Sequence, residues 1–280
     1  MLRLPQCVHA LVFVMSIGVS IGELAAEEKP VTFEHDIQPL LTRFGCNAGA
    51  CHGKSRGQNG FALSLLGFDS DFDYAAITRE GRGRRILPAA PRSSLLLQKA
   101  TGRVPHGGGA RFAENSKQFE LLVRWLEGGA PRTPVDAPKL VRVVVEPPTK
   151  SLVAGQSSHL QVFAEYSDGS RRDVTESAAY QSNDRTIASV TDEGVVEAGP
   201  VSGETAVLAR YMNNIAVCHI ALPIPGEVAQ KVYAKLPTHN EIDRLVWKKL
   251  KVLGMLPSGE ADDSKFMRRS YLRVIGRLPA

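Results

Sequence analysis

Cysteines and aromatic residues are scarce in this 280-residue sequence, and it has no long apolar run beyond its N-terminus. Four cysteines are too few for a disulfide-built scaffold. A bundle of membrane helices is excluded, because each spanning helix needs about 20 apolar residues. Hydrophobic residues make up 43% and charged residues 22% of the chain, which excludes a disordered or collagen-like protein. A globular chain of this length is expected to form two or three domains.

The excess of positive charge is spread unevenly along the chain. Residues 31–132 carry 14 Lys and Arg against 9 Asp and Glu, residues 137–222 carry 7 against 10, and residues 223–280 carry 11 against 6. No segment concentrates basic residues into the stripe that nucleic-acid-binding proteins present. The charge pattern therefore predicts no nucleic-acid partner.

The N-terminus has the pattern of a secretory signal. Arg3 precedes an apolar run from Ala10 to Gly22, and the small residues Ala25 and Ala26 follow at a suitable cleavage point. The run is shorter than a spanning helix, so we predict that residues 1–26 are a cleaved signal peptide; an uncleaved anchor is the alternative. The mature chain is expected to be exported to the periplasm or cell surface, with no membrane span.

Hydrophobic periodicity divides the rest of the chain into three segments. Residues 31–132 are predicted to be mainly helical with glycine-rich loops, including a helix from Ser116 to Glu127 that ends at two glycines. Residues 137–222 alternate with a period of two, which predicts six or more short strands and a β-sandwich. Residues 238–280 contain two predicted helices, the first opened by a capping box at Thr238. We interpret this last segment as the N-terminal part of a larger helical domain.

The motif Cys46-Asn47-Ala48-Gly49-Ala50-Cys51-His52 is the sharpest chemical feature. Covalent c-type haem attachment needs two thiols followed directly by a histidine that binds the iron. The usual motif has two residues between the cysteines, whereas this one has four. On spacing alone, three readings stay open: a haem site, a Cys46–Cys51 disulfide, and a metal site using both thiols and His52, for which no fourth ligand is evident nearby.

Three stretches resemble one family of exported proteins. The segments FEHDIQPLLTRFGCNAGACHGKSRGQNGFALSLLGFD, GRRILPAAPRSSLLLQKATGRVPHGGGARF and WLEGGAP resemble the planctomycete-type cytochrome c domain with a widened attachment motif. AEYSDGSRRDVT and the strands after it resemble a bacterial immunoglobulin-like group 2 domain. NEIDRLVWKKLKVLG with FMRRSYLRVIGRLP resembles the start of the associated cytochrome-linked domain of unknown function.

The resemblance implies a multidomain fold: a small all-α cytochrome c-like domain, then an all-β immunoglobulin-like sandwich, then the start of a mainly helical domain. It also implies that Cys46 and Cys51 bind haem c covalently and that His52 is the proximal iron ligand. A further C-terminal domain and a redox partner of unknown identity are expected with it.

The second axial ligand can be narrowed from the residues themselves. None of the five methionines lies in residues 31–132, so a Met-ligated haem is not available within that segment. His106 lies in a glycine-rich loop that can approach a flat macrocycle, and we prefer it as the sixth ligand. The alternatives are His35 and an open or water-bound position. Arg82, Arg84 and Arg85 could pair with haem propionates, or form an ordinary solvated charge run.

Other motifs carry less weight. Gly53-Lys54-Ser55-Arg56-Gly57 matches a nucleophile elbow, but its context is not the strand-to-helix turn that a hydrolase requires. Alternation on its predicted strand places Cys218 in the core as a free thiol. We find no catalytic site in this chain.

The sequence therefore predicts an exported c-type cytochrome module that transfers electrons through a bis-His haem. One alternative is a haem-free secreted or surface protein, structural or adhesive, in which Cys46 and Cys51 form a disulfide. Another is a multidomain enzyme whose catalytic residues lie beyond Ala280.

Overall fold

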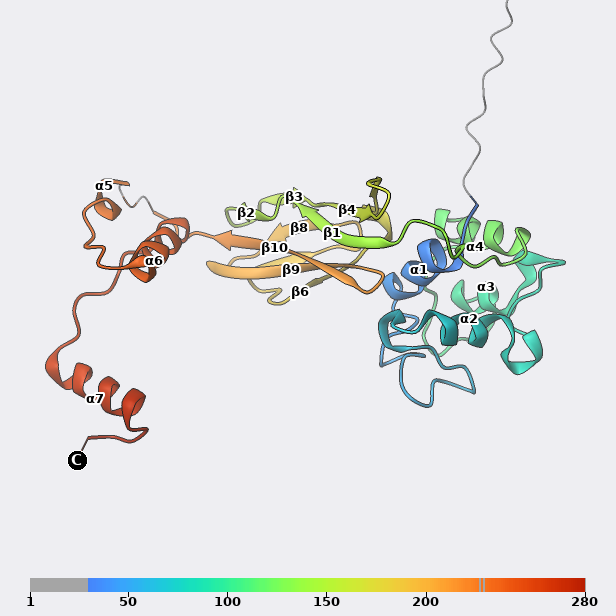
Figure 1. Ribbon diagram of the computed structural model, residues 1–280, viewed down its shortest axis with the longest axis horizontal. Coiled ribbons are helices and arrows are strands. Elements are labelled where there is room, and N and C mark those ends of the chain that lie inside the picture. Colours follow the sequence, from blue (N-terminus) through green and yellow to red (C-terminus); the bar gives the residue numbers. More distant parts are fainter. Residues whose placement is uncertain (1–29, 227, 229, 280) are drawn as a thin grey trace, which may run out of the picture. The chain divides into compact units, whose positions relative to one another are not determined.

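The computed structural model describes residues 30–226, 228 and 230–279 (Figure 1). The predicted signal peptide, residues 1–26, lies outside these residues. Within the described ranges, no helix is both long enough and apolar enough to cross a membrane. The described chain contains two separate hydrophobic cores, one built from residues 33–130 and one from residues 145–222.

The first core belongs to a region of short helices joined by long turns. A π-helical turn at Phe33–Ile37 leads into α1 (Gln38–Arg43), and α2 (Ser70–Thr78), α3 (Leu95–Ala100) and α4 (Lys117–Glu127) follow. Three single 3-10 turns lie between them, at Leu65–Gly67, Glu80–Gly83 and Pro91–Ser93.

Helix α4 forms as the sequence predicts. The Ser116 side chain accepts a hydrogen bond from the Phe119 amide and caps the helix. Its apolar face is almost completely buried, and Trp125 is buried beside that face with its indole N–H donating to the Pro131 carbonyl. This helix supplies the largest side chains of the first core.

The second region contains ten strands. They are β1 (Leu140–Glu146), β2 (Thr149–Ser151), β3 (Ser157–His159), β4 (Gln161–Tyr166), β5 (Arg171–Asp173), β6 (Ala179–Ser182), β7 (Ala188–Val190), β8 (Val195–Ala198), β9 (Gly203–Tyr211) and β10 (Asn214–Leu222). They form three sheets with the orders β1-β4-β5, β2-β10-β9-β6 and β3-β8-β7. All pairings are antiparallel except that of β2 with β10. The long hairpin of β9 and β10 is its most extensive pairing.

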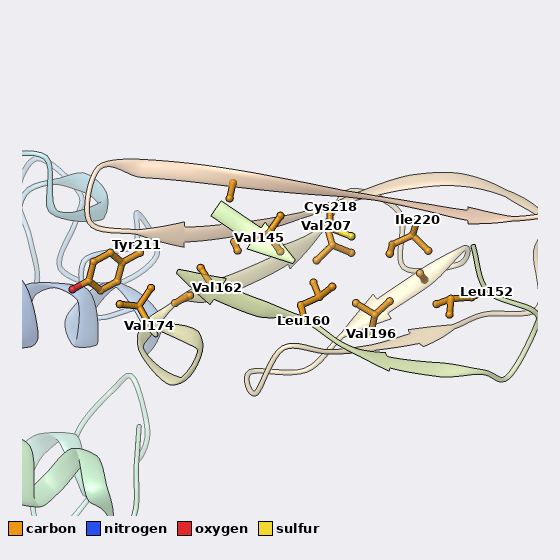
Figure 2. Packing of buried hydrophobic residues seen from close by; sticks show 14 of the residues in the cluster. Val145, Leu152, Leu160, Val162, Val174, Val196, Val207, Tyr211, Cys218 and Ile220 are labelled. Carbon is orange, nitrogen blue, oxygen red and sulfur yellow. The ribbon is translucent and has the colours of Figure 1, made fainter. Parts of the chain in front are cut away.

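Aliphatic side chains from all three sheets fill the second core (Figure 2). Alternation along β10 buries Cys218 and Ile220 and leaves Val217 and His219 on the other face. Cys218 is a fully buried free thiol, as its position in the sequence predicts, and burial raises its pKa to about 11.

The C-terminal helices are α5 (Gln230–Tyr233), α6 (Glu241–Val252) and α7 (Asp263–Val274). Helix α6 is capped by Asn240, whose side chain accepts from the Asp243 amide, and not by Thr238 as the capping-box pattern predicts. Neither α6 nor α7 buries a residue.

The predicted fold class is wrong in two respects. Residues 31–132 are not an all-α cytochrome c-like domain, because the helices are short and long stretches of turn lie between them, with glycines such as Gly45, Gly57 and Gly81 at positive φ. The β-rich region has three sheets and not the two of an immunoglobulin-like sandwich.

We predict that Leu160→Ala destabilises the β-rich region by about 2–5 kcal/mol, because Leu160 is fully buried in the second core. Chemical denaturation followed by circular dichroism measures the change. Val153→Ala is the matched control, since Val153 is 67% exposed, and should cost about 0.5 kcal/mol or less. Equal losses for the two variants would contradict this description of the core.

Candidate functional site

Backbone hydrogen bonds close the loop from Cys46 to His52. The His52 amide donates to the Cys46 carbonyl at 3.0 Å, and the Cys51 amide donates to the Ala48 carbonyl at 2.9 Å. Asn47 is fully buried beneath the loop, where its side-chain amide donates to the Thr42 hydroxyl. The four residues between the cysteines are therefore folded into a compact turn, which returns His52 to the start of the motif.

This loop forms one wall of a cavity of about 820 Å³. Cys46, Cys51, His52 and His106 all line it, so the fold brings together the four residues that the sequence singled out. His35 is not among the lining residues. The cavity is within the size range of cofactor pockets. Its apolar lining includes Leu40, Leu41, Leu95, Leu96, Phe112 and Leu122.

The rings of the two cavity histidines lie close together and nearly parallel. Their ring centroids lie 6.2 Å apart and the ring planes differ by 7°. His52 Nδ1 is 2.9 Å from the Phe61 carbonyl oxygen, and His106 Nδ1 is 2.8 Å from the Gly109 carbonyl oxygen. A carbonyl oxygen only accepts, so each Nδ1 carries a proton, and in the neutral form of a ring held this way Nε2 keeps its lone pair. Metal-binding histidines are commonly oriented by such a hydrogen bond.

Phe61 packs against His52, and Arg85 packs over Phe61. The Phe61 ring packs 4.5 Å from the His52 ring, and the Arg85 guanidinium lies 4.5 Å above the Phe61 ring. Arg85 is buried and donates to the carbonyls of Ala76, Glu80 and Gly60. Burial lowers the pKa of His52, and the nearby cationic groups add to that effect. His52 is therefore neutral near pH 7, as a ligand must be.

Arg111 and His106 both lie close to Gly108. A Cβ atom on Gly108 would lie 2.7 Å from the Arg111 guanidinium and 3.1 Å from His106 Cε1. Lys99 donates to the Pro105 carbonyl and ties the start of the loop to α3. The glycine-rich sequence thus allows His106 and Arg111 to lie side by side at the cavity.

Cys46 and Cys51 are both free thiols in this structure, so the predicted Cys46–Cys51 disulfide is not formed. Burial raises the pKa of the Cys46 thiol to about 11. The Cys51 sulfur accepts a hydrogen bond from Arg111 Nη2 at 3.1 Å. Arg111, Phe61 and Lys99 carry no sequence pattern that links them to the Cys46–His52 motif, and sequence reasoning missed them.

The residues present fit a haem. Two imidazoles with nearly parallel rings, two thiols and an apolar lining in one cavity are the donor set that a covalent bis-His haem requires.

The comparisons with known proteins do not support the predicted cytochrome. No known family model matches the chain. Ice-binding protein 1 of Shewanella frigidimarina (strain NCIMB 400) is 31% identical over 75 residues, which are 27% of this chain and 8% of that protein. Domains 4 and 5 of the S-layer protein SbsC are 18% identical, covering 31% of this chain and 53% of theirs with a TM-score of 0.27. The Yersinia pseudotuberculosis adhesin InvE is 14% identical, covering 29% and 25% with a TM-score of 0.18.

The chain therefore spans well under two thirds of each of these proteins. The TM-scores are too low to support an argument about fold or function.

These findings correct the prediction of a metal-binding, electron-transferring cytochrome. No all-α haem domain is present in the described ranges, and the curated protein that matches part of the chain is an ice-binding protein. Among the residues that the structure describes, no group of three or more His, Cys, Asp or Glu could hold a metal ion. This also removes the alternative of a metal site built from Cys46, Cys51 and His52.

We predict that Arg85→Met lowers the unfolding free energy by roughly 2–3 kcal/mol, because it leaves three backbone carbonyls without their donor and removes the cation above Phe61. Thermal or urea denaturation measures the loss. Arg82→Met is the matched control, since Arg82 is exposed and should cost about 0.5 kcal/mol or less. A loss no larger than that of the control would remove Arg85 from this structural role.

Proposed function

We propose that this chain is an exported surface protein with a structural or adhesive role, in which the β-rich region is the structural module. The observation that carries the proposal is the 31% identity to part of an ice-binding protein. A ten-strand region with its own complete core agrees with such a module. The activity of the relative is not transferred, because only 8% of its length is matched.

We predict that the full chain is exported when produced in a bacterial host, and that its N-terminus begins after Ala26 because residues 1–26 are removed. Cell fractionation and mass measurement of the purified chain test this. A variant without residues 1–26 is the control and should stay in the cytoplasm. Recovery of the full-length, uncleaved chain from the cytoplasm would overturn the proposal of export.

A second candidate function is favoured by the His52–His106 pair: the cavity binds a covalently attached haem. A haem iron takes four ligands from the porphyrin and needs two from the protein. Two histidines that each donate from Nδ1 to a backbone carbonyl, in a cavity that also presents two thiols, support this cofactor.

The chain's own residues would have distinct tasks at that site. Cys46 and Cys51 would bond the vinyl groups, and His52 and His106 would bind the iron. The Phe61 and Gly109 carbonyls hold the proton of each ring on Nδ1. The leucines and Phe112 would exclude water from the macrocycle.

We predict that the chain carries haem that survives acid extraction when it is produced in a host with haem-attachment machinery. The reason is that acid does not cleave a thioether bond. Cys51→Ser should lower the retained haem strongly. Cys218→Ser is the matched control, because Cys218 is buried in the β-rich region and should leave attachment unchanged. No acid-resistant haem on the unaltered chain would refute the cofactor.

We further predict that His106→Ala converts a low-spin haem spectrum to a high-spin one, because the sixth ligand is lost. His159→Ala, which alters an exposed histidine of β3, is the control and should leave the spectrum low-spin. Absorption spectroscopy of the loaded chain measures the change, and an unchanged spectrum in His106→Ala would exclude His106 as a ligand.

A further inference from the structure

The cavity wall carries charge of one sign. Arg84, Arg85, Lys99 and Arg111 line it, and no Asp or Glu is among its lining residues. A concave surface with cationic groups and no carboxylates attracts anions, and the effect is stronger next to an apolar wall of low dielectric. The ligand of this cavity should therefore carry negative charge as well as a large apolar surface.

Two of the four cationic side chains already donate hydrogen bonds to backbone carbonyls within the fold. Arg85 donates to three backbone carbonyls, and Lys99 donates to the Pro105 carbonyl. Arg84 and Arg111 differ from them. Within the described ranges neither forms an ion pair with a carboxylate, and the polar contact of Arg111 is with Cys51 Sγ. Their guanidinium groups keep donors for a ligand.

The fold holds Arg111 close to the histidine pair. A Cβ atom on Gly108 would contact both the Arg111 guanidinium and His106, so these two side chains converge on the same glycine. The Arg111 amide donates to the Ala100 carbonyl at 2.6 Å, which fixes the residue beside α3. Arg84 lies next to the buried Arg85, which anchors that part of the chain.

We propose that Arg84 and Arg111 form a carboxylate-binding rim of the cavity, so that its ligand is a flat apolar ring system that carries carboxylates. Guanidinium groups bind carboxylates through paired hydrogen bonds, which gives both affinity and orientation. The inference rests on the proposed haem function and extends it. Recognition of the carboxylate edge of the ligand is thereby assigned to two residues outside the Cys46–His52 motif.

The test uses the full haem-free chain and two probes, ferric protoporphyrin IX and its dimethyl ester, which differ only in the two carboxylates. Titration at the Soret band measures each dissociation constant. We expect the diacid to bind about tenfold or more tightly than the ester. In the double variant Arg84→Gln/Arg111→Gln the ratio should fall to about twofold or less, while ester binding stays the same.

Arg56→Gln/Arg82→Gln is the matched control. It removes the same charge at two exposed arginines that do not line the cavity, and it should keep the preference for the diacid. Equal binding of the two probes to the unaltered chain would overturn the rim and leave the haem site standing. A preference that survives in the double variant would also overturn it. Failure of both probes to bind would overturn the haem site and the rim together.

Discussion

The candidate site depends on two hydrogen bonds that hold protons on the outer nitrogens of its histidines. Each Nδ1 donates to a backbone carbonyl, His52 to Phe61 and His106 to Gly109. Because an imidazole near neutral pH carries one proton, these bonds leave both Nε2 atoms as acceptors. The two rings are nearly parallel. The closed Cys46–His52 loop and the ring of Phe61 position His52, and the glycine-rich loop positions His106.

The rest of the chain is organised around a different constraint, the burial of aliphatic side chains between sheets. The second core is closed by residues of β1, β4, β8, β9 and β10 and needs no ligand or disulfide. Such a region suits a surface protein, in which a stable spacer or adhesive module carries other functions. The haem-binding candidate and the surface role are therefore compatible, because they use different residues and different cores.

Patterns that act over a few residues could be predicted from the sequence. Helix α4 follows from its serine cap and terminal glycines, and β1, β9 and β10 follow from alternation over seven residues or more. The prediction of six or more strands does not resolve β2, β5 and β6, since each has only three or four residues and shows no clear period. The all-α prediction failed because helix-like spacing around residues 33–44 says nothing about the long turns that follow.

The site was predictable only where its chemistry is local. Cys46, Cys51 and His52 are recognised from one short motif, and His106 from the absence of methionine together with its glycines. Phe61 and Arg111 were missed, and Arg85 was considered only as a partner of haem propionates, because the roles of all three arise from contacts across the fold. Arg85, for example, reaches the Gly60 carbonyl 25 positions away, and no sequence pattern marks such a contact.

The tautomers of His52 and His106 test the central claim most directly. Long-range proton–nitrogen NMR spectra of the nitrogen-15-labelled, haem-free chain, recorded at about pH 8 and assigned with His52→Gln and His106→Gln, report which ring nitrogen is protonated. The structure predicts that both rings carry the proton on Nδ1 and that both Nε2 atoms are unprotonated. A proton on Nε2 of either ring would contradict the account.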